Sequence, residues 1–219
     1  LVDEIWLNKS RVKINKFFIL NSKYTGEDYK SKVNIICKIL KNIKINKLLI
    51  TAPENLAWIL NIRGKDSKYS PLPNCHAVVD INKKITLIVN KNKISKKFKS
   101  HFENILNYIS PSNIVKYLNN ISSKEIFLID KSTCSFFYKR EIKKRFKYKE
   151  KIDPIFFLKA KKNKIEINNS IKSHIEDGVA LTKFIYWIKN SINKLKITEI
   201  SAEKKLEKFR KQNTNYQFP

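Results

Sequence analysis

The sequence predicts an α/β fold in which a layer with a mixed β-sheet and flanking helices is followed by a segment made of helices. Two observations predict the layer. Short runs of β-branched and aromatic residues alternate with amphipathic helical patterns, and two neighbouring runs form a hairpin pattern. A third observation is a long helical pattern without strands after Pro154, which predicts that a different structural unit begins there.

The first elements alternate strand, helix and strand. Residues 17–20 predict a short strand, and Gly26, Glu27 and Asp28 then precede a helix, because acidic residues favour a helix N-terminus. Residues 48–51 predict a second, buried strand. The apolar residues of the helix recur at helical spacing and predict one buried face opposite the lysines. These residues are Tyr29, Val33, Ile36, Cys37 and Leu40.

A helix and a hairpin come next. Pro53 and Glu54 are typical of a helix start, and the helix is expected over residues 55–61. Residues 76–81 and 85–89 both read as strands. The short polar link between them is typical of a β-hairpin.

A second amphipathic helix is expected over residues 94–109, before the Ser-Pro-Ser break at residues 110–112. Its apolar stripe is Phe98, Phe102, Ile105, Leu106 and Ile109.

The last elements of the layer are two strands and a helix. Residues 114–115 and 125–130 predict the strands, with room for a short helix over 116–120 between them. Ser132 and Thr133 are expected to cap a final helix that runs through Arg145.

The segment after Pro154 predicts two successive helices. A helical pattern covers residues 164–192, and Thr198 with Glu199 begins another helix that carries Ile200, Leu206 and Phe209. Without a sheet to cover them, the apolar faces of these helices are expected to be exposed, and the segment to be labile or prone to aggregation.

The formal net charge of +27 raises the question of a nucleic-acid partner. Of the 46 cationic residues, however, only five are arginine, the residue that nucleic-acid surfaces favour for its planar, bidentate fork. Lysine, asparagine and isoleucine are abundant together, a pattern typical of A/T-rich coding sequences. Nucleic-acid binding is therefore not expected as the main function. No run of residues is apolar enough for a membrane span, and no signal peptide opens the chain.

Cysteines and histidines give no metal-binding pattern. Cys37, Cys75 and Cys134 are widely spaced without a C-x-x-C pair, which favours reduced cysteines in a cytoplasmic protein. His76, His101 and His174 fall in unrelated elements. His174 with Asp177 at i+3 has the spacing for a metal, but a surface hydrogen bond on a helix is far more common.

The stretch Trp58 to Asp66 is the candidate site. The chain has only three glycines, Gly26, Gly64 and Gly178, against roughly 15 expected at average usage. Each is therefore expected where the backbone needs positive φ or a close approach. The structural alternative is that Asn61 and Gly64 cap a helix and that Arg63 pairs with Asp66.

Four ordered stretches resemble the three-domain Xaa-Pro aminopeptidases. The family's N-R-G-x-D segment is similar to residues 57–66 (AWILNIRGKD) together with Tyr69 and Pro71. The opening of the family's second domain is similar to residues 1–6. Residues 159–167 (KAKKNKIEI) resemble the entry into the catalytic domain. Residues 173–181, 198–199 and 209–210 continue the resemblance.

The resemblance implies a creatinase N-terminal-like domain over residues 1–153 and the first helices of a truncated pita-bread metallopeptidase domain over 154–219. It implies a metal-dependent exopeptidase that removes the residue preceding proline, with two divalent ions, expected to be Mn²⁺. Proline-containing peptides, a homodimer and a cytoplasmic location are implied with it. The family's metal ligands, two aspartates, a histidine and two glutamates, lie later in the catalytic domain.

No stretch of this chain matches those ligands, so we expect no catalytic residue or bound metal in it, and no activity from it alone. Leu1 at the start and Pro219 at the end both look like cuts, which predicts a fragment. In relatives, loops of the preceding domains help to wall the cleft, so Arg63, Asp66 and Tyr69 are the substrate-cleft candidates. Asn61, Gly64 and Gly178 are expected to be structural, with Gly178 allowing its helix to pack.

Two other function classes stay open. One is a non-catalytic module for dimerisation or interaction, left by truncation of a gene. The other is a basic RNA- or DNA-binding domain, which would bind polyanions with a steep salt dependence.

Overall fold

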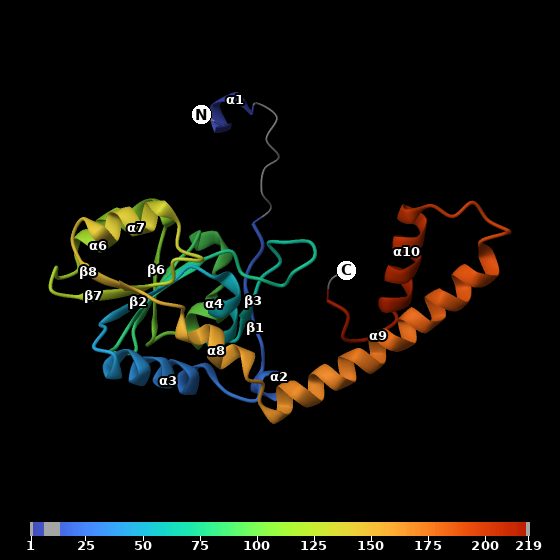
Figure 1. Cartoon of the computed structure of the whole chain (residues 1–219), viewed down its shortest axis with the longest axis horizontal. Helices are drawn as coiled ribbons and strands as arrows, with labels where there is room; N and C mark the ends of the chain where they lie inside the picture. Colours follow the sequence, from blue (N-terminus) through green and yellow to red (C-terminus); the bar gives the residue numbers. More distant parts are fainter. Residues whose placement is uncertain (1, 7–13, 218–219) are drawn as a thin grey trace.

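The computed structural model describes residues 2–6 and 14–217, and it shows an α/β layer from which a helical hairpin extends (Figure 1). A six-stranded mixed sheet forms the centre of the layer, in the order β6-β5-β4-β2-β7-β8. The mixed α/β fold class is therefore confirmed. The strands are β2 Lys47–Ile50, β4 His76–Asp80, β5 Ile85–Ile88, β6 Leu106–Ile109, β7 Ile126–Ile129 and β8 Lys147–Glu150. A separate antiparallel pair consists of β1 Phe18–Ile19 and β3 Ile62–Arg63.

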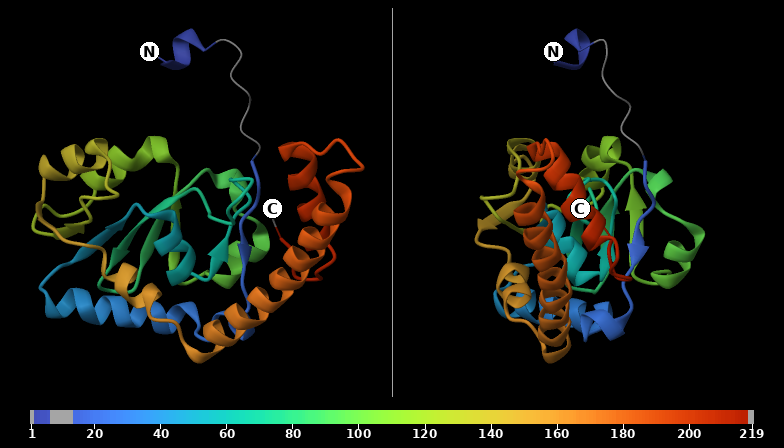
Figure 2. Two further views of the ribbon diagram at one scale, coloured as in Figure 1. Left: turned by 45° about the vertical axis from the view of Figure 1, so that its right-hand side comes forward. Right: turned by 90° about the vertical axis from the view of Figure 1, so that its right-hand side faces the viewer.

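Helices cover both faces of the sheet (Figure 2). One face packs against α3 Tyr29–Asn42, α4 Pro53–Ile59, α5 Lys96–His101 and α8 Pro154–Ala160. The other face packs against α6 Ile114–Asn119 and α7 Phe136–Lys143. The remaining helical segments are α1 Val2–Ile5, α2 Ser22–Thr25, α9 Lys164–Ser191, α10 Glu199–Arg210 and the 3₁₀ turns Lys91–Lys93 and Pro111–Asn113.

Alternation along the strands divides the core into two parts. Leu48 and Ile50 of β2 lie in the core beneath α3 and α4, whereas Leu49 between them lies in the core beneath α6 and α7. Successive side chains of a strand point to opposite faces, so a strand buried on both faces is apolar throughout. The expected hairpin is confirmed, since β4 and β5 pair antiparallel.

Helix α3 forms where the sequence predicts it. The Asp28 side chain accepts a hydrogen bond of 2.8 Å from the Ser31 amide and caps the helix. All five residues of the expected apolar stripe are buried. Fully burying a side chain such as Ile36 or Leu40 stabilises the fold by about 1.5–3 kcal/mol.

The prediction of one helix over residues 94–109 is wrong. Ser95 caps the short helix α5, the chain turns after His101, and residues from Leu106 onward form strand β6. Phe98 and Phe102 are buried as their spacing predicts. Strand β6 forms instead of further helix because the parallel edge of β5 supplies hydrogen-bond partners that are distant in sequence.

Residues 114–115 form the start of α6 and not a strand, so that expectation is also wrong. Ile114 and Leu118, four residues apart, share the buried side of the helix, while Val115 is partly exposed. Ser135, and not Ser132 or Thr133, caps the last helix of the layer. The hydroxyls of Ser132 and Thr133 bind Asp130 and Thr51 instead.

Two other boundaries differ from expectation. Helix α4 begins at Pro53 and ends at Ile59, earlier than the expected range of 55–61. Helix α7 ends at Lys143, and β8 follows as an edge strand that the sequence does not signal. Three of its four residues are charged, two lysines and a glutamate, a composition typical of a protected sheet edge.

The two predicted helices form as α9 and α10, and they pack against each other as a hairpin beyond the layer (Figure 1). Arg210 of α10 binds Asp177 of α9 through two hydrogen bonds of 2.6 and 3.2 Å. The apolar side of α9 is open to solvent, with Ile175 64% and Tyr186 72% exposed. Within the described part of the chain, no helix is long and apolar enough to cross a bilayer.

Asp153 fixes the start of α8 to the layer. Its buried carboxylate caps α8 by accepting the Ile155 amide at 2.9 Å, and it also accepts from the Asn55 side chain at 2.8 Å. Its own amide donates to the Asp130 carboxylate at 2.9 Å. Burial raises the pKa of Asp153 to about 6 despite these hydrogen bonds, and nearby Asp130 raises it further.

The Asp153 carboxyl should make stability depend on pH. Its pKa in an unfolded chain is about 3.9, so between about pH 4 and 6 the folded state binds more protons and stability falls as pH rises. Asp153→Asn retains a helix cap and removes this titration. Between pH 4.5 and pH 7, Asp153 should lower the free energy of unfolding by about 2 kcal/mol, and this decrease should be absent from the variant. Urea unfolding at pH 4.5 and pH 7 measures it, and an unchanged difference between the two pH values would contradict the assignment.

Candidate functional site

The candidate site begins at a tight turn after α4. Asn61 has φ 53°, a left-handed conformation that asparagine tolerates better than most residues, and it ends the helix as the structural alternative expects. Its side-chain amide donates to the Glu27 carbonyl at 2.8 Å, and its Oδ1 accepts from Lys32 Nζ at 2.7 Å. Glu27 and Lys32, which lie 34 and 29 residues before Asn61, therefore hold this turn.

Lys32 is a buried cation beneath the turn, with only 1% of the residue exposed. Its Nζ also donates to the Trp58 carbonyl at 3.1 Å and lies 4.2 Å from the centre of the Trp58 ring. Burial lowers the pKa of Lys32 to about 8, while Glu166 and Glu27 oppose the shift. The ammonium is tolerated because these partners replace water.

Arg63 points back toward its own segment. Its Nη1 donates to the carbonyls of Ala57 and Ile62, at 3.0 and 2.8 Å. Burial lowers the pKa of the guanidinium, and Glu166 opposes that shift. The expected pairing of Arg63 with Asp66 is wrong, because both side chains have other partners.

Asp66 fixes the following loop to the layer. Its carboxylate forms a buried ion pair of 2.8 Å with Lys93 and accepts the Asn74 amide at 2.7 Å. Asn74 lies at the other end of the same loop. The ion pair and the amide together hold both ends of the loop against the 3₁₀ turn that carries Lys93.

Gly64 permits a close backbone approach. A Cβ built at this position would lie 2.8 Å from the Leu72 carbonyl oxygen and 2.8 Å from Pro73 Cα. The Gly64 amide donates to the Pro71 carbonyl at 2.9 Å, so the loop closes on itself at this point. The expectation of a close approach is confirmed for Gly64. In contrast, apart from its chain neighbours and the nearby backbone of its own helix, no described atom lies within 4 Å of a Cβ built at Gly178, so the expected role of Gly178 in helix packing is not seen.

Tyr69 is the exposed member of the three cleft candidates. It is 57% exposed, and its hydroxyl accepts a hydrogen bond of 2.8 Å from Lys68. A depression of about 210 Å³ separates it from α10, where Glu203, Glu207 and Arg210 line the opposite wall. A second depression of about 200 Å³ is lined by Phe18, Gln217 and six loop residues, Gly64, Lys65, Ser67, Lys68, Ser70 and Pro71. The loop and α10 thus face each other across a shallow gap.

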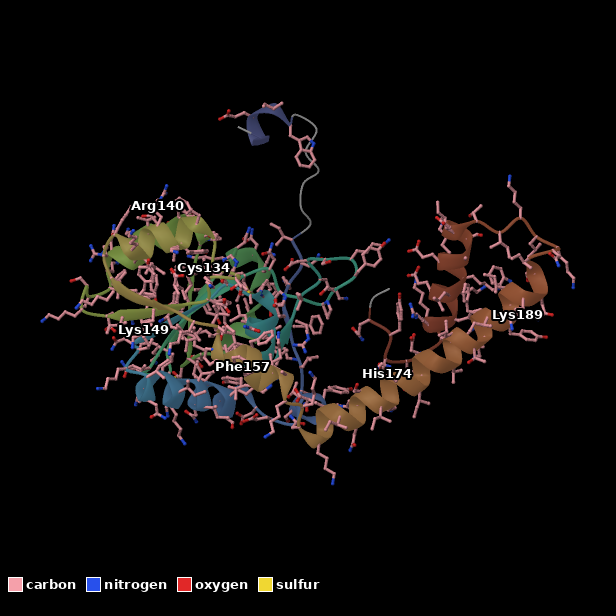
Figure 3. The ribbon with its side chains drawn as sticks, viewed as in Figure 1. Cys134, Arg140, Lys149, Phe157, His174 and Lys189 are labelled. Carbon is pink, nitrogen blue, oxygen red and sulfur yellow. The ribbon has the colours of Figure 1, made fainter. Side chains whose placement is uncertain are left out.

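The described residues do not fit a two-metal centre. Among residues 2–6 and 14–217, no group of three or more His, Cys, Asp or Glu side chains is placed to hold a metal ion. Asp177, the partner suggested for His174, is bound by Arg210. Figure 3 shows His174 on α9, away from the layer that carries Cys134. His76 instead shares a hydrogen bond of 2.9 Å with the Tyr138 hydroxyl.

Comparison with known proteins identifies the family. The family model for the creatinase/prolidase N-terminal domain matches residues 8–166, which is more than half of the chain. The chain belongs to this family. The family assignment agrees with the fold, since the match covers the whole α/β layer and the first turn of α9.

Relatives of this creatinase N-terminal family member are much longer. Xaa-Pro aminopeptidase 1 of Dictyostelium discoideum is 32% identical over 208 residues, covering 92% of this chain and 32% of the relative. Xaa-Pro aminopeptidase ApepP of Drosophila melanogaster is 30% identical over 224 residues, covering 99% and 36%. The chain therefore spans about a third of the length of these curated relatives.

Solved structures share the fold. X-prolyl aminopeptidase from Caenorhabditis elegans, described as a cytosolic enzyme with a di-nuclear active site, has a TM-score of 0.89 at 22% identity. The similarity covers 99% of this chain and 36% of that enzyme. A prolidase from Pyrococcus horikoshii OT3 has a TM-score of 0.57 at 19% identity, covering 84% and 49%.

Sequence reasoning missed Lys32 and Lys93, which hold the candidate loop in place. A signal for Lys32 exists, because it lies three residues after Tyr29 and four before Ile36, on the apolar side of α3. No comparable local signal marks Lys93, whose partner Asp66 lies 27 residues away.

Gly64→Ala should destabilise the protein, because the new methyl group meets backbone atoms that cannot move independently. We expect a loss of about 1–3 kcal/mol in the free energy of unfolding. Gly178→Ala is the matched control, with open space around it in the interior of α9. It should stabilise that helix by about 0.5–1 kcal/mol. Urea unfolding of both variants tests the assignment, and equal effects would contradict it.

Proposed function

We propose that this chain is the non-catalytic α/β domain and the first catalytic-domain helices of an Xaa-Pro aminopeptidase. Residues 1–153 would be the creatinase-like domain, and residues 154–219 the start of the pita-bread domain. The carrying observation is that similarity to Xaa-Pro aminopeptidases runs through the layer and continues through the α9–α10 hairpin. The exposed apolar side of α9 supports it, since an unpartnered face of this kind is typical of an interface.

The complete enzyme would be a metal-dependent exopeptidase that removes the N-terminal residue preceding proline. Two divalent ions, in our proposal Mn²⁺, would activate the attacking water and stabilise the tetrahedral intermediate. The residues described here do not fit such a centre. The chain alone would therefore be inactive, and its contribution would be to shape the cleft. A homodimer and a cytoplasmic location complete the proposal.

Within this proposal, the loop from Arg63 to Tyr69 would form one wall of the substrate cleft. Arg63 and Asp66 bind partners within the chain, so they would hold the wall in place. Tyr69 faces the gap toward α10 and would contact the peptide. Lys68 Nζ lies 4.7 Å from the centre of the Tyr69 ring, and the aromatic area that remains exposed would suit the apolar ring of proline.

The alternative is a non-catalytic interaction module. The same exposed side of α9 favours it, because such a face would bind a separate partner if no further domain covers it. The reading frame beyond Pro219 distinguishes the two. A continuing frame with two aspartates, a histidine and two glutamates supports the enzyme, and an immediate stop codon supports the module.

Kinetics of the full-length protein test the cleft assignment. Tyr69→Ala should raise KM for an Xaa-Pro peptide about fivefold to tenfold with kcat little changed, since it removes binding shared by substrate and transition state. Its thermal stability should hardly change because Tyr69 is exposed.

Two further variants complete this test. Phe136→Ala, at an exposed aromatic residue on α7, is the control and should leave KM unchanged. Arg63→Ala should lower thermal stability, because the Ala57 and Ile62 carbonyls lose their donor. An unchanged KM in a folded Tyr69→Ala enzyme would remove Tyr69 from the cleft.

A further inference from the structure

The start of α9 is attached to the layer through one side chain. Asn163 caps the helix by accepting the Glu166 amide at 3.0 Å, and Glu166 accepts the Asn163 amide at 3.0 Å in return. The side-chain nitrogen of Asn163 also donates to the Thr25 carbonyl, at 2.8 Å. One amide group therefore both starts α9 and connects it to a turn 138 residues earlier.

Gly26 makes room for this contact. It ends α2 with φ 70°, and a Cβ built on it would lie 2.4 Å from Asn163 Oδ1. Both the backbone conformation and the close approach favour glycine at this position. Further along α9, Asn169 donates to the Tyr24 carbonyl at 3.1 Å, so the contact extends beyond the first turn of the helix.

The same turn contacts the candidate site. Glu27, next to Gly26, accepts hydrogen bonds at its carbonyl from Thr25 Oγ1 at 3.0 Å and from Asn61 at 2.8 Å. Lys32 binds the other end of the Asn61 amide. A continuous series of hydrogen bonds therefore leads from the cap of α9 to the residue that precedes the Arg63 strand.

Electrostatic interactions also link the first turn of α9 to Lys32 and Arg63 near the candidate site. Lys32 and Arg63 are cations withdrawn from water, and burial lowers the pKa of each. Glu166, in the first turn of α9, opposes the shift at both sites. The first turn of α9 thus supplies negative charge to the buried cation Lys32 and the partly buried cation Arg63, and moving α9 away would leave both less well compensated.

We infer that Gly26, Lys32, Asn163 and Glu166 are positioning residues that fix α9 relative to the Arg63–Tyr69 loop. We name this set the α9 clamp. It holds the loop and α10 at a set separation across the gap lined by Tyr69 and Glu207. The importance of that separation for a peptide rests on the proposed function, whereas the clamp itself is a property of this chain.

Distance measurements on the 219-residue chain test the clamp without substrate or metal. Spin labels are placed at Ser67→Cys in the loop and Lys204→Cys on α10, with Cys134→Ser removing the partly exposed thiol. Asn163→Ser keeps a helix-capping hydroxyl but loses the bond to Thr25. Gly26→Ala places a methyl group against Asn163, and Gly178→Ala is the control.

The clamp predicts a narrow distance distribution in the parent chain and in Gly178→Ala, and broad distributions in Asn163→Ser and Gly26→Ala. Circular dichroism shows whether each variant is folded. If Gly26→Ala does not fold, Asn163→Ser decides the test. An unchanged distribution in folded Asn163→Ser would overturn the inference, whatever the activity of the full-length enzyme.

Hydrogen exchange tests the connection to the candidate site. In Asn163→Ser, amides of residues 61–66 should exchange about tenfold faster, as expected when a supporting hydrogen bond is lost. Gly178→Ala should leave them unchanged. Faster exchange confined to the first turn of α9 would show that the clamp does not reach the loop, and would overturn that part of the inference.

Discussion

The buried ammonium of Lys32 is the interaction on which the candidate site depends. A charge removed from water must be met by fixed polar groups, and here the Trp58 carbonyl and Asn61 Oδ1 meet it. Those two contacts hold the last turn of α4 and place Asn61 in its left-handed conformation. The chain then enters β3 in the direction that brings Arg63 back over the end of α4.

Much of the layer could be predicted from the sequence because its strands and helices carry strong local patterns. The stripe of α3, the strand β2 and the β4–β5 hairpin all combine a clear period with a clear boundary. Strands β6 and β8 could not be predicted in this way. Leu106 continues a helical stripe, and Lys147 begins a charged edge strand, so both depend on neighbouring strands that are distant in sequence.

The backbone conformation of the candidate site could be predicted from the sequence, but the interaction partners of its charged side chains could not. Asn61 and Gly64 stand where a left-handed turn and a close approach occur, and residue type alone points to both. Asp66 appears from its spacing to be a partner for Arg63, yet it pairs with Lys93. Local spacing cannot rank a neighbour three residues away against one brought near by the fold.

The most direct test is the titration of the Lys32 amine, followed by NMR of its side-chain Cε and Nζ signals. The signal is assigned by its absence from Lys32→Met. A buried ammonium bonded to Asn61 and Trp58 should titrate with a pKa of about 8. A pKa near the usual lysine value of about 10.4 would show an exposed amine. That result would contradict the structural basis proposed for the Asn61 turn and the α9 clamp.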